Sequence, residues 1–191
     1  MRIPQEKRLS MYLKRMKTIE GELAERAMAL YQSAFPAIER RDAAEHLRVM
    51  KKEDYHFDLI MQNEQFCGVM LYWETADFIF LEHFATLPEL RGQGIGSAAL
   101  SLLKAKGKPV ILEIEPPADE LTRRRLGFYQ RNGFKVTPHR HIQAKYRPDD
   151  ADLVLTVLSY PHGINEEEYR RFYRYMQREV SCAASADERS T

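Results

Sequence analysis

The sequence predicts an α/β (α+β) fold, in which a mixed, mostly antiparallel sheet with a central parallel strand pair is flanked by helices. Three observations predict it: strands dominate residues 55–86, a glycine-rich turn then leads into an amphipathic helix, and another strand follows that helix. Strands joined by short turns pair antiparallel, whereas a strand–helix–strand crossover pairs in parallel. The glycine-rich turn is therefore expected between the antiparallel meander and the parallel pair.

One domain accounts for most of the chain. A length of 191 residues suffices for one domain with a substantial core and is short for two. We expect a single domain over residues 1–180 and a disordered tail over residues 181–191, where small and polar side chains dominate.

Charge and cysteine usage exclude several classes of protein. With 29 basic and 28 acidic residues, the chain lacks the basic excess of a nucleic-acid binder. No stretch approaches the roughly 18 apolar residues of a membrane span, and the N-terminal segment has no apolar signal core. Cys67 and Cys182 show no disulfide framework, and the histidines show no ligand spacing beyond His139-x-His141. We expect a cytoplasmic monomer or homodimer that binds no metal, nucleic acid or membrane.

The N-terminal segment predicts one strand and two helices. Apolar residues alternate over residues 9–13, as in a half-buried strand. A helix is expected from a cap at Thr18 to the residues before Pro36, because proline bars its continuation. Asp42 and Glu45 have the residue types of a capping box and predict a second short helix.

An antiparallel meander should follow. Residues 57–61 and 66–73 read as strands with a turn between them, and Phe78–Thr86 reads as a central strand. This third strand is apolar on both faces except at Glu82 and His83, which is typical of a buried strand. In a regular strand these two side chains point to opposite faces.

The glycine-rich turn within Leu90–Leu100 predicts an anion-binding loop. A helix begins at or near Gly94, and Gly107 stands where a left-handed C-terminal cap is expected. The free N–H groups and the positive end of the helix dipole would face the loop, and glycine lets a phosphate approach the backbone. A tight turn without a ligand is the alternative interpretation.

The C-terminal third predicts a strand, a hairpin and a helix. Val110–Glu115 reads as a strand that pairs in parallel with the central one. Residues 142–146 and 153–160 flank a turn signal and read as a closing hairpin. The last helix is expected from Asn165 to Val180, with three glutamates in the first turn.

Two motifs resemble one known family. Arg91-x-x-Gly94-x-Gly96 follows the long strand, and Phe128-Tyr129-x-x-x-Gly133-Phe134 comes about one strand and one helix later. This arrangement resembles the GCN5-related N-acetyltransferase (GNAT) family. The resemblance implies the GNAT fold and an acetyl-CoA-dependent N-acetyltransferase, in which a primary amine attacks the thioester directly. The acceptor, a small molecule or a peptide or protein amine, stays open.

The resemblance also implies a binding site for acetyl-CoA, the co-substrate. The loop would hold its pyrophosphate, and a backbone N–H at a bulge in the preceding strand would stabilise the oxyanion. A basic cluster within residues 123–131 is an obvious partner for the 3′-phosphate of CoA, although a solvated helix face is equally open. The implied cofactor-binding residues are Phe84, Ala85, Thr86, Arg91, Gly92, Gln93, Gly94, Ile95, Gly96, Ser97 and Arg124.

Two residues are candidates for catalysis. Tyr129 matches the family's proton donor to the departing thiolate, with a core aromatic as the alternative. Glu82 is a carboxylate in an apolar strand, where burial would raise its pKa toward that of a general base. A hydrogen-bonded structural carboxylate is the alternative for Glu82, and a structural role is expected for His83.

Three further carboxylates are candidates for binding the acceptor amine. Glu113 and Glu115 share one face at the C-terminal end of their strand, the edge where α/β sheets bind ligands. They could instead be the solvent face of a strand end. Glu39 lies in a polar link that walls the acceptor site in the resembling enzymes, although a solvated connection also fits this link.

Two other functions remain open. Gly92-x-Gly94-x-Gly96, with Glu113 about 20 residues later, partly matches a dinucleotide-dependent oxidoreductase, but the spacing differs from G-x-G-x-x-G and no βαβ series surrounds it. A non-catalytic acyl-CoA sensor or interaction module would keep the loop without turnover. Tyr129 and Glu82 count against that module.

Overall fold

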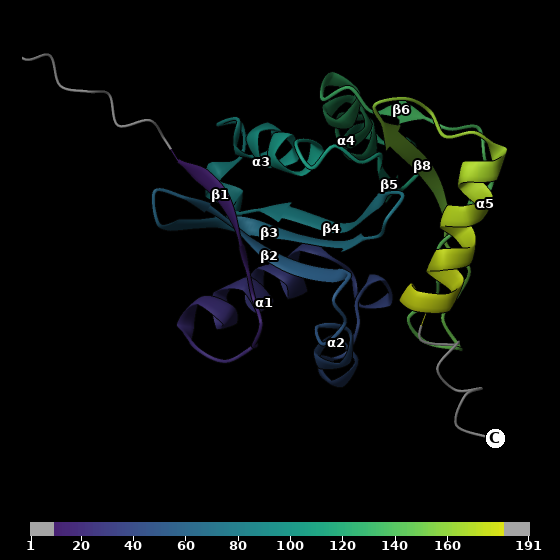
Figure 1. The fold of residues 1–191 in the computed structure, drawn as a ribbon. Coiled ribbons are helices and arrows are strands. Elements are labelled where there is room, and N and C mark those ends of the chain that lie inside the picture. Colours follow the sequence, from purple (N-terminus) through teal and green to yellow (C-terminus); the bar gives the residue numbers. More distant parts are fainter. Residues whose placement is uncertain (1–9, 182–191) are drawn as a thin grey trace, which may run out of the picture.

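The computed structural model describes residues 10–181, which form an eight-stranded sheet with helices on both faces (Figure 1). The strand order is β1-β2-β3-β4-β5-β8-β6, and β7 pairs with another part of β8. The strands are β1 (Met11–Arg15), β2 (Tyr55–Gln62), β3 (Gln65–Glu74), β4 (Ile79–Thr86), β5 (Val110–Ile114), β6 (Lys135–Val136), β7 (His141–Ile142) and β8 (Val154–Tyr160).

Five α-helices and several shorter turns connect these strands. The α-helices are α1 (Glu22–Ala34), α2 (Ala43–Val49), α3 (Ile95–Lys104), α4 (Glu120–Arg131) and α5 (Glu166–Tyr175). Two 3₁₀ turns, η1 (Ala37–Glu39) and η2 (Pro88–Leu90), precede α2 and α3, and a π-helical turn, η3 (Met176–Val180), continues α5. None of the helices within residues 10–181 has the length and apolar composition needed to cross a bilayer.

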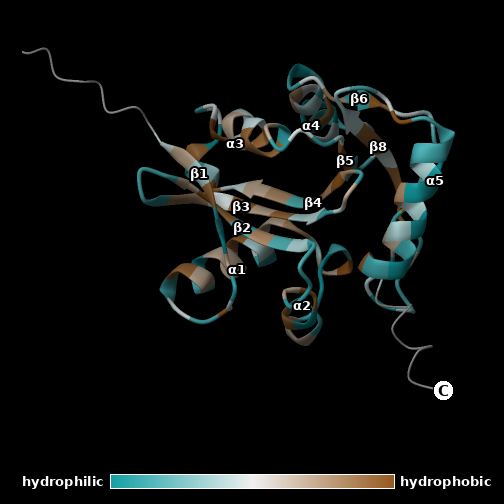
Figure 2. Ribbon diagram, in the orientation of Figure 1, coloured by the Kyte–Doolittle hydropathy of each residue, from teal (hydrophilic) through white to brown (hydrophobic). Residues whose placement is uncertain are grey.

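The sheet separates two hydrophobic clusters. Helices α1 and α2 cover one face and α3 and α4 the other, while α5 packs near β8 (Figure 1). The first cluster includes Tyr31, Trp73 and Phe172, and the second includes Leu100 and Leu103 of α3. Figure 2 shows hydrophobic residues along β5 and β8 and hydrophilic residues over much of α5. Phe172 is the fully buried residue of α5, and Tyr169, Tyr173 and Tyr175 pack against the first cluster while partly buried.

The predicted change from antiparallel to parallel pairing is confirmed. Strands β1 to β4 form an antiparallel meander, and β5 pairs in parallel with β4. The parallel pairing is short and ends at Leu81, which lies opposite Leu112. At the same point β4 bulges against β3, because His83 faces Leu71 whereas Leu81 faces Tyr72. Beyond this bulge β4 keeps β3 as its partner and parts from β5.

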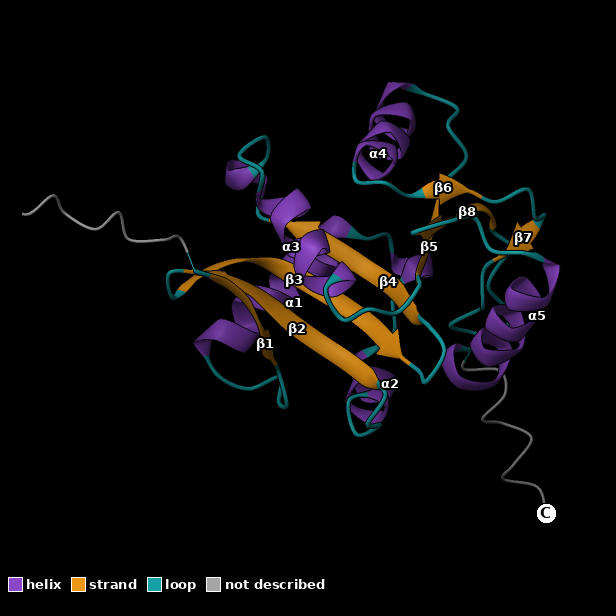
Figure 3. Cartoon of the chain, turned by 45° about the horizontal axis from the view of Figure 1, so that its top comes forward, coloured by secondary structure: helices purple, strands orange, loops and turns teal. Residues whose placement is uncertain are grey.

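Two predicted boundaries were wrong. Helix α1 begins at Glu22 after Gly21, without a side-chain cap, and the Thr18 hydroxyl accepts a hydrogen bond from Glu20 instead. The closing hairpin is shorter than predicted, because only His141–Ile142 pairs with the start of β8 (Figure 3). The expected disordered tail lies outside the described residues, except for Ser181.

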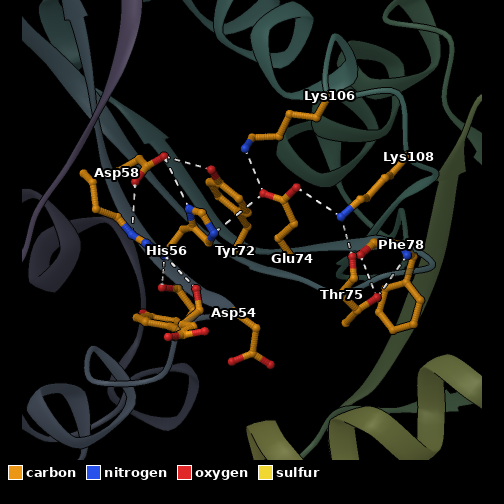
Figure 4. A network of polar contacts seen from close by, with 12 residues as sticks. Asp54, His56, Asp58, Tyr72, Glu74, Thr75, Phe78, Lys106 and Lys108 are labelled. Carbon is orange, nitrogen blue, oxygen red and sulfur yellow. Dashed lines mark hydrogen bonds and ion pairs between the residues drawn. The ribbon is translucent and has the colours of Figure 1, made fainter.

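Helix α3 is fixed at its C-terminal end by a polar network. Gly107 has the predicted left-handed conformation, with φ of 77°. Glu74, at the end of β3, lies between Lys106 and Lys108, at 2.8 and 3.2 Å from their Nζ atoms (Figure 4). Lys108 also donates to the Thr75 carbonyl oxygen at 2.6 Å. These contacts join the segment after α3 to the β3–β4 turn.

Gly68 lies opposite Thr86 in a position that admits no side chain. A Cβ atom there would overlap the Ala85 carbonyl oxygen and lie 2.9 Å from Thr86 Cα. Because both neighbours are backbone, Gly68→Ala should destabilise the fold by about 1–3 kcal/mol in urea unfolding. Gly163→Ala is the control, since its Cβ would meet nothing closer than 3.9 Å. Equal stability of the two variants would contradict this packing.

Candidate active site

After Leu81 and Leu112, strands β4 and β5 are no longer paired. We call the place where they separate the gap, and it is the centre of the candidate site. Leu87 N donates to the Cys67 carbonyl oxygen at 2.9 Å, so Ala85 and His83 also bond to β3 in this antiparallel register. By the same alternation, the N–H groups of Phe84 and Thr86 point to the other edge, where β5 no longer pairs. Of the three β4 residues predicted to bind the donor, Phe84 and Thr86 present backbone groups to the gap, and Ala85 does not.

The glycine-rich turn leads directly into α3. Gly92 and Gly94 have φ of 79° and 81°, and no atom lies within 4 Å of a Cβ built on either. No side chain caps α3, and its first intrahelical bond runs from Ala98 N to the Gly94 carbonyl oxygen. The three preceding N–H groups, those of Ile95, Gly96 and Ser97, therefore have no partner within the helix and are available to an anion.

Three elements meet at Gly96. A Cβ atom there would lie 3.2 Å from the Phe128 ring of α4 and 3.6 Å from the Phe84 ring of β4. Glycine at this position thus lets the two helices and the strand approach closely. Elsewhere in the turn, Gln93 Nε2 donates to the Glu89 carbonyl oxygen at 2.9 Å, while Arg91 is exposed.

Tyr129 lies on α4, on the same face of the sheet as α3. It belongs to the cluster that contains Leu81 and Leu112, the last residues paired between β4 and β5. Its ring packs edge-on against Phe128 and Phe134, and the residue is 8% exposed. Burial raises the pKa of Tyr129 to about 12, so the phenol carries its proton at neutral pH. The hydroxyl makes no hydrogen bond to any other residue in the range 10–181.

The basic residues of α4 divide between the two sides of the helix. Arg124 is exposed one helical turn before Phe128, which places it on the side of the helix that faces the glycine-rich turn. Arg125 instead forms an ion pair with Glu115. Arg124 therefore remains a candidate for contacting the donor's phosphates.

A buried ion pair occupies the α1 side of the gap. Arg41 Nη1 lies 2.7 Å from Glu82 Oε1, and the two side chains are 0% and 1% exposed. Tyr146 Oη donates to Glu82 Oε1 at 2.7 Å, and Trp73 Nε1 donates to Oε2 at 3.1 Å. Arg41 Nη2 donates to the Val180 carbonyl oxygen at 3.1 Å. The pair thus joins five separate parts of the chain at the bulge.

The expected rise in the pKa of Glu82 was wrong. Burial alone would raise it, but the Arg41 guanidinium, His83 and the Tyr146 hydroxyl together hold the pKa of Glu82 below its ordinary value. Both carboxylate oxygens already have partners. This geometry favours the structural alternative for Glu82 over the general base.

The bulge also changes the direction of His83. Instead of pointing to the opposite face, His83 lies on the same face as Glu82, with Nδ1 3.9 Å from Glu82 Oε2. Its Nε2 donates to the Glu39 carbonyl oxygen at 2.7 Å, and its ring packs against Tyr31 and Phe35. Burial lowers the pKa of His83, so the imidazole is neutral near pH 7.

The three carboxylates predicted to bind the acceptor come together beside the gap. Glu113 bonds to the buried His141, whose other nitrogen lies 3.0 Å from Tyr169 Oη of α5. Glu115 pairs with Arg125. Glu39 of η1 is half-buried and lies close enough to Glu113 and Arg125 for both to shift its pKa.

Sequence reasoning missed several residues of this site. Arg41, Trp73 and Tyr146 surround Glu82, yet they come from a polar link, the middle strand of the meander and a segment predicted as a hairpin strand. No spacing relates them, because they lie 9 to 64 positions from Glu82 in the chain. An isolated carboxylate in an apolar strand was the one signal that such a partner must exist.

We also searched the described residues for a metal site and for cavities. Within residues 10–181 no three His, Cys, Asp or Glu side chains are grouped as a metal ion would require. Two cavities lie elsewhere. One of about 210 Å³ lies between α1, residues 37–43 and Arg147, and one of about 510 Å³ lies between the start of α1, the β2–β3 hairpin and η2. Neither is lined by Glu39, Glu113 or Tyr129.

Comparisons with known proteins point to one family. Residues 53–136 match the family model described as acetyltransferase (GNAT) domain. The chain is 36% identical over 103 residues to "Putative acetyltransferase YjbC" of Bacillus subtilis (strain 168), covering 53% of this chain and 52% of that protein. The chain thus spans about half the length of the curated relative that it matches.

Solved structures share the fold. The "Putative acetyltransferase from GNAT family from Bacteroides thetaiotaomicron" is 26% identical, with a TM-score of 0.82 over 88% of this chain and 97% of its own. A GNAT family acetyltransferase from Elizabethkingia anophelis with acetyl-CoA bound is 15% identical, with a TM-score of 0.50 over 81% of this chain and 98% of its own. The second likeness shows the fold alone.

The buried ion pair gives a prediction about stability. Arg41→Met leaves the Glu82 charge buried without its cation, which should lower the free energy of unfolding by about 3–5 kcal/mol at neutral pH. Without Arg41 the folded pKa of Glu82 rises above its unfolded value, so the loss relative to wild type should shrink as the pH falls toward about 4.5. Urea unfolding at both pH values measures this.

The double variant Arg41→Met/Glu82→Gln is the control for this experiment. Removing both charges should recover part of the lost stability, because no unpaired ion remains. A single variant that loses the same stability at both pH values would contradict the assignment of an ionised Glu82.

Proposed function

Because the chain belongs to the GNAT acetyltransferase family, whose model matches residues 53–136, we propose that it transfers an acetyl group from acetyl-CoA to a primary amine. The amine attacks the thioester carbonyl carbon directly, without an acetylated enzyme residue. The acceptor is a small-molecule, peptide or protein amine.

One observation carries this proposal: β4 has no partner β5 after Leu81, and this unpaired edge lies between the start of α3, which Phe84 approaches at Gly96, and the buried cluster that contains Leu81 and Tyr129. The N–H groups of Ile95, Gly96 and Ser97 suit a pyrophosphate at one end of this edge. The N–H groups of Phe84 and Thr86 suit the amide-containing arm of CoA along it. This placement brings the thioester to the bulge, between the two faces of the sheet.

The chemistry needs an oxyanion partner and a proton donor. Attack by the amine places negative charge on the carbonyl oxygen, which a backbone N–H beside the bulge would stabilise. Glu82 has an almost fully buried side chain, yet the residue as a whole is half-buried, so its exposed surface is backbone. Tyr129 then supplies a proton to the departing thiolate, since its phenol is protonated at neutral pH.

The charge beside the gap favours a cationic acceptor. Glu39, Glu113 and Glu115 lie near one guanidinium, that of Arg125, and Glu113 also bonds to the imidazole of His141. An ammonium group would be attracted to this excess of negative charge before it loses a proton. Glu82 contributes no net charge, because Arg41 neutralises it.

The sheet also bears on the alternative functions. A dinucleotide-dependent oxidoreductase would need repeated parallel βαβ units, whereas β4 and β5 are the one parallel pair among residues 10–181. A non-catalytic acyl-CoA sensor differs from an enzyme only in turnover. Measurement of acetyl transfer to a panel of amines, alongside acetyl-CoA binding, separates these functions.

The glycine-rich turn gives a prediction about donor binding. Gly94→Val should weaken CoA binding by more than about tenfold, because a β-branched residue does not adopt the left-handed conformation that aims the α3 N–H groups. Isothermal titration calorimetry with CoA measures the loss. The fold should survive, since no atom occupies the space of the new side chain within 4 Å of its Cβ.

Gly107→Val is the matched control for that variant. Gly107 has φ of 77°, similarly open surroundings, and a position at the opposite end of α3. The substitution should cost similar stability and leave CoA affinity unchanged. Equal affinity for CoA in both folded variants would overturn the placement of the pyrophosphate.

Tyr129→Phe gives a prediction about turnover. The substitution keeps the ring in its cluster and removes only the proton, so kcat should fall by about 10²- to 10⁴-fold while acetyl-CoA affinity and Tm barely change. Tyr160→Phe is the control, because Tyr160 also packs against Phe134 but lies on β8. A near wild-type kcat for Tyr129→Phe, with chemistry limiting turnover, would assign Tyr129 to packing.

A further inference from the structure

We propose that Glu39 is the general base that removes a proton from the acceptor amine. This inference rests on the proposed acetyl transfer and assigns a catalytic role to a residue for which a binding role alone was expected.

The position of Glu39 is defined from both sides of the gap. Its backbone carbonyl oxygen accepts a hydrogen bond from His83 Nε2 of β4 at 2.7 Å. Its carboxylate lies close enough to Glu113 of β5 and Arg125 of α4 to feel both charges. Glu39 thus contacts β4 just after the bulge and also approaches β5. It therefore lies over the point where the two strands separate.

Glu39 differs from the other carboxylates in its bonding. Glu82 is held by Arg41, Tyr146 and Trp73, Glu113 by His141, and Glu115 by Arg125. Within the described chain the carboxylate of Glu39 has neither a hydrogen bond nor an ion pair. It is therefore the acidic group at the gap that keeps its oxygens available to an amine.

The backbone around Glu39 is held firmly. Arg147 donates from Nη1 to the Ala37 carbonyl oxygen at 3.1 Å and from Nη2 to the Arg40 carbonyl oxygen at 3.2 Å. With the bond from His83, three hydrogen bonds from two side chains hold η1 and the residue after it. A free carboxylate on a fixed backbone suits a group that must meet a substrate nitrogen in one orientation.

The electrostatic surroundings support proton transfer at neutral pH. Burial raises the pKa of Glu39, Arg125 opposes the rise, and Glu113 adds to it, so the pKa lies above its ordinary value. A raised pKa brings a carboxylate closer to the operating pH, where a general base is most effective.

The protons balance as follows. The ammonium nitrogen of the acceptor loses one proton to Glu39, and the neutral amine attacks the thioester carbon, forming the C–N bond. The tetrahedral intermediate loses a second N–H proton as it collapses, and the C–S bond breaks. Tyr129 delivers a proton to the sulfur and regains one, through solvent, from the second N–H group, while Glu39 releases the first proton to solvent. One proton thus ends on CoA and one in solvent.

The test compares two kinds of amine with the purified full chain. Spermidine and a lysine peptide are protonated at neutral pH, whereas trifluoroethylamine is already neutral and needs no base. Glu39→Gln should lower kcat/KM for the protonated amines by about 10²- to 10⁴-fold and change trifluoroethylamine far less. The wild-type rate should fall as the pH is lowered through the Glu39 pKa, and this limb should be absent in Glu39→Gln.

Binding and stability serve as controls. Acetyl-CoA affinity and Tm of Glu39→Gln should match wild type, because the carboxylate bonds to nothing in the described chain. Glu22→Gln, an exposed carboxylate on α1, should leave kcat/KM for every amine unchanged. An equal fall for neutral and protonated amines would overturn the base assignment in favour of simple amine binding.

The outcomes separate this proposal from the proposed function. If wild type acetylates the amines and Glu39→Gln does so at the same rate with the same pH profile, acetyl transfer stands and Glu39 is not the base. If wild type binds acetyl-CoA but acetylates no amine of the panel, both proposals fall.

Discussion

The buried ion pair between Arg41 and Glu82 is the interaction on which the candidate site depends. A carboxylate inside an apolar strand is costly unless a cation and hydrogen-bond donors surround it. Arg41 supplies the cation from the link after α1, while Tyr146 and Trp73 supply the donors. Because Arg41 also bonds to the Val180 carbonyl oxygen, the pair fixes the α1–α2 link and the end of η3 against β4. The pair therefore stabilises the tertiary structure and is not expected to transfer a proton.

The bulge at Glu82 organises both faces of the gap. It turns Glu82 and His83 to the same face, and beyond it β4 is left without β5. On one face this exposes the edge that leads from the start of α3 to Tyr129. On the other face it allows His83 to hold the carbonyl oxygen of Glu39. The candidate donor and acceptor sites thus depend on one irregularity in a single strand.

Much of the fold and of the candidate donor site could be predicted from local sequence. The alternation in the strands, the left-handed glycine at position 107, and the helix starts near Gly94 and at Asn165 are all present where the sequence placed them. These features depend on residues within a few positions of each other, so a short window contains their physical cause. The cap at Thr18 was wrong because nothing local distinguishes it from Gly21, where helical hydrogen bonding begins.

The sequence by itself determined the element order, the glycine-rich turn before a helix and the presence of several carboxylates near one sheet edge. Only the tertiary structure decided their roles. From the sequence alone, Glu82, Glu113 and Glu115 could each meet a substrate. In the structure each is bonded to a side chain from another element, namely Arg41, His141 and Arg125 in that order. Glu39 is left without such a partner. The charge state and availability of a carboxylate depend on what folding brings within a few ångströms, and that distance is not encoded by spacing along the chain.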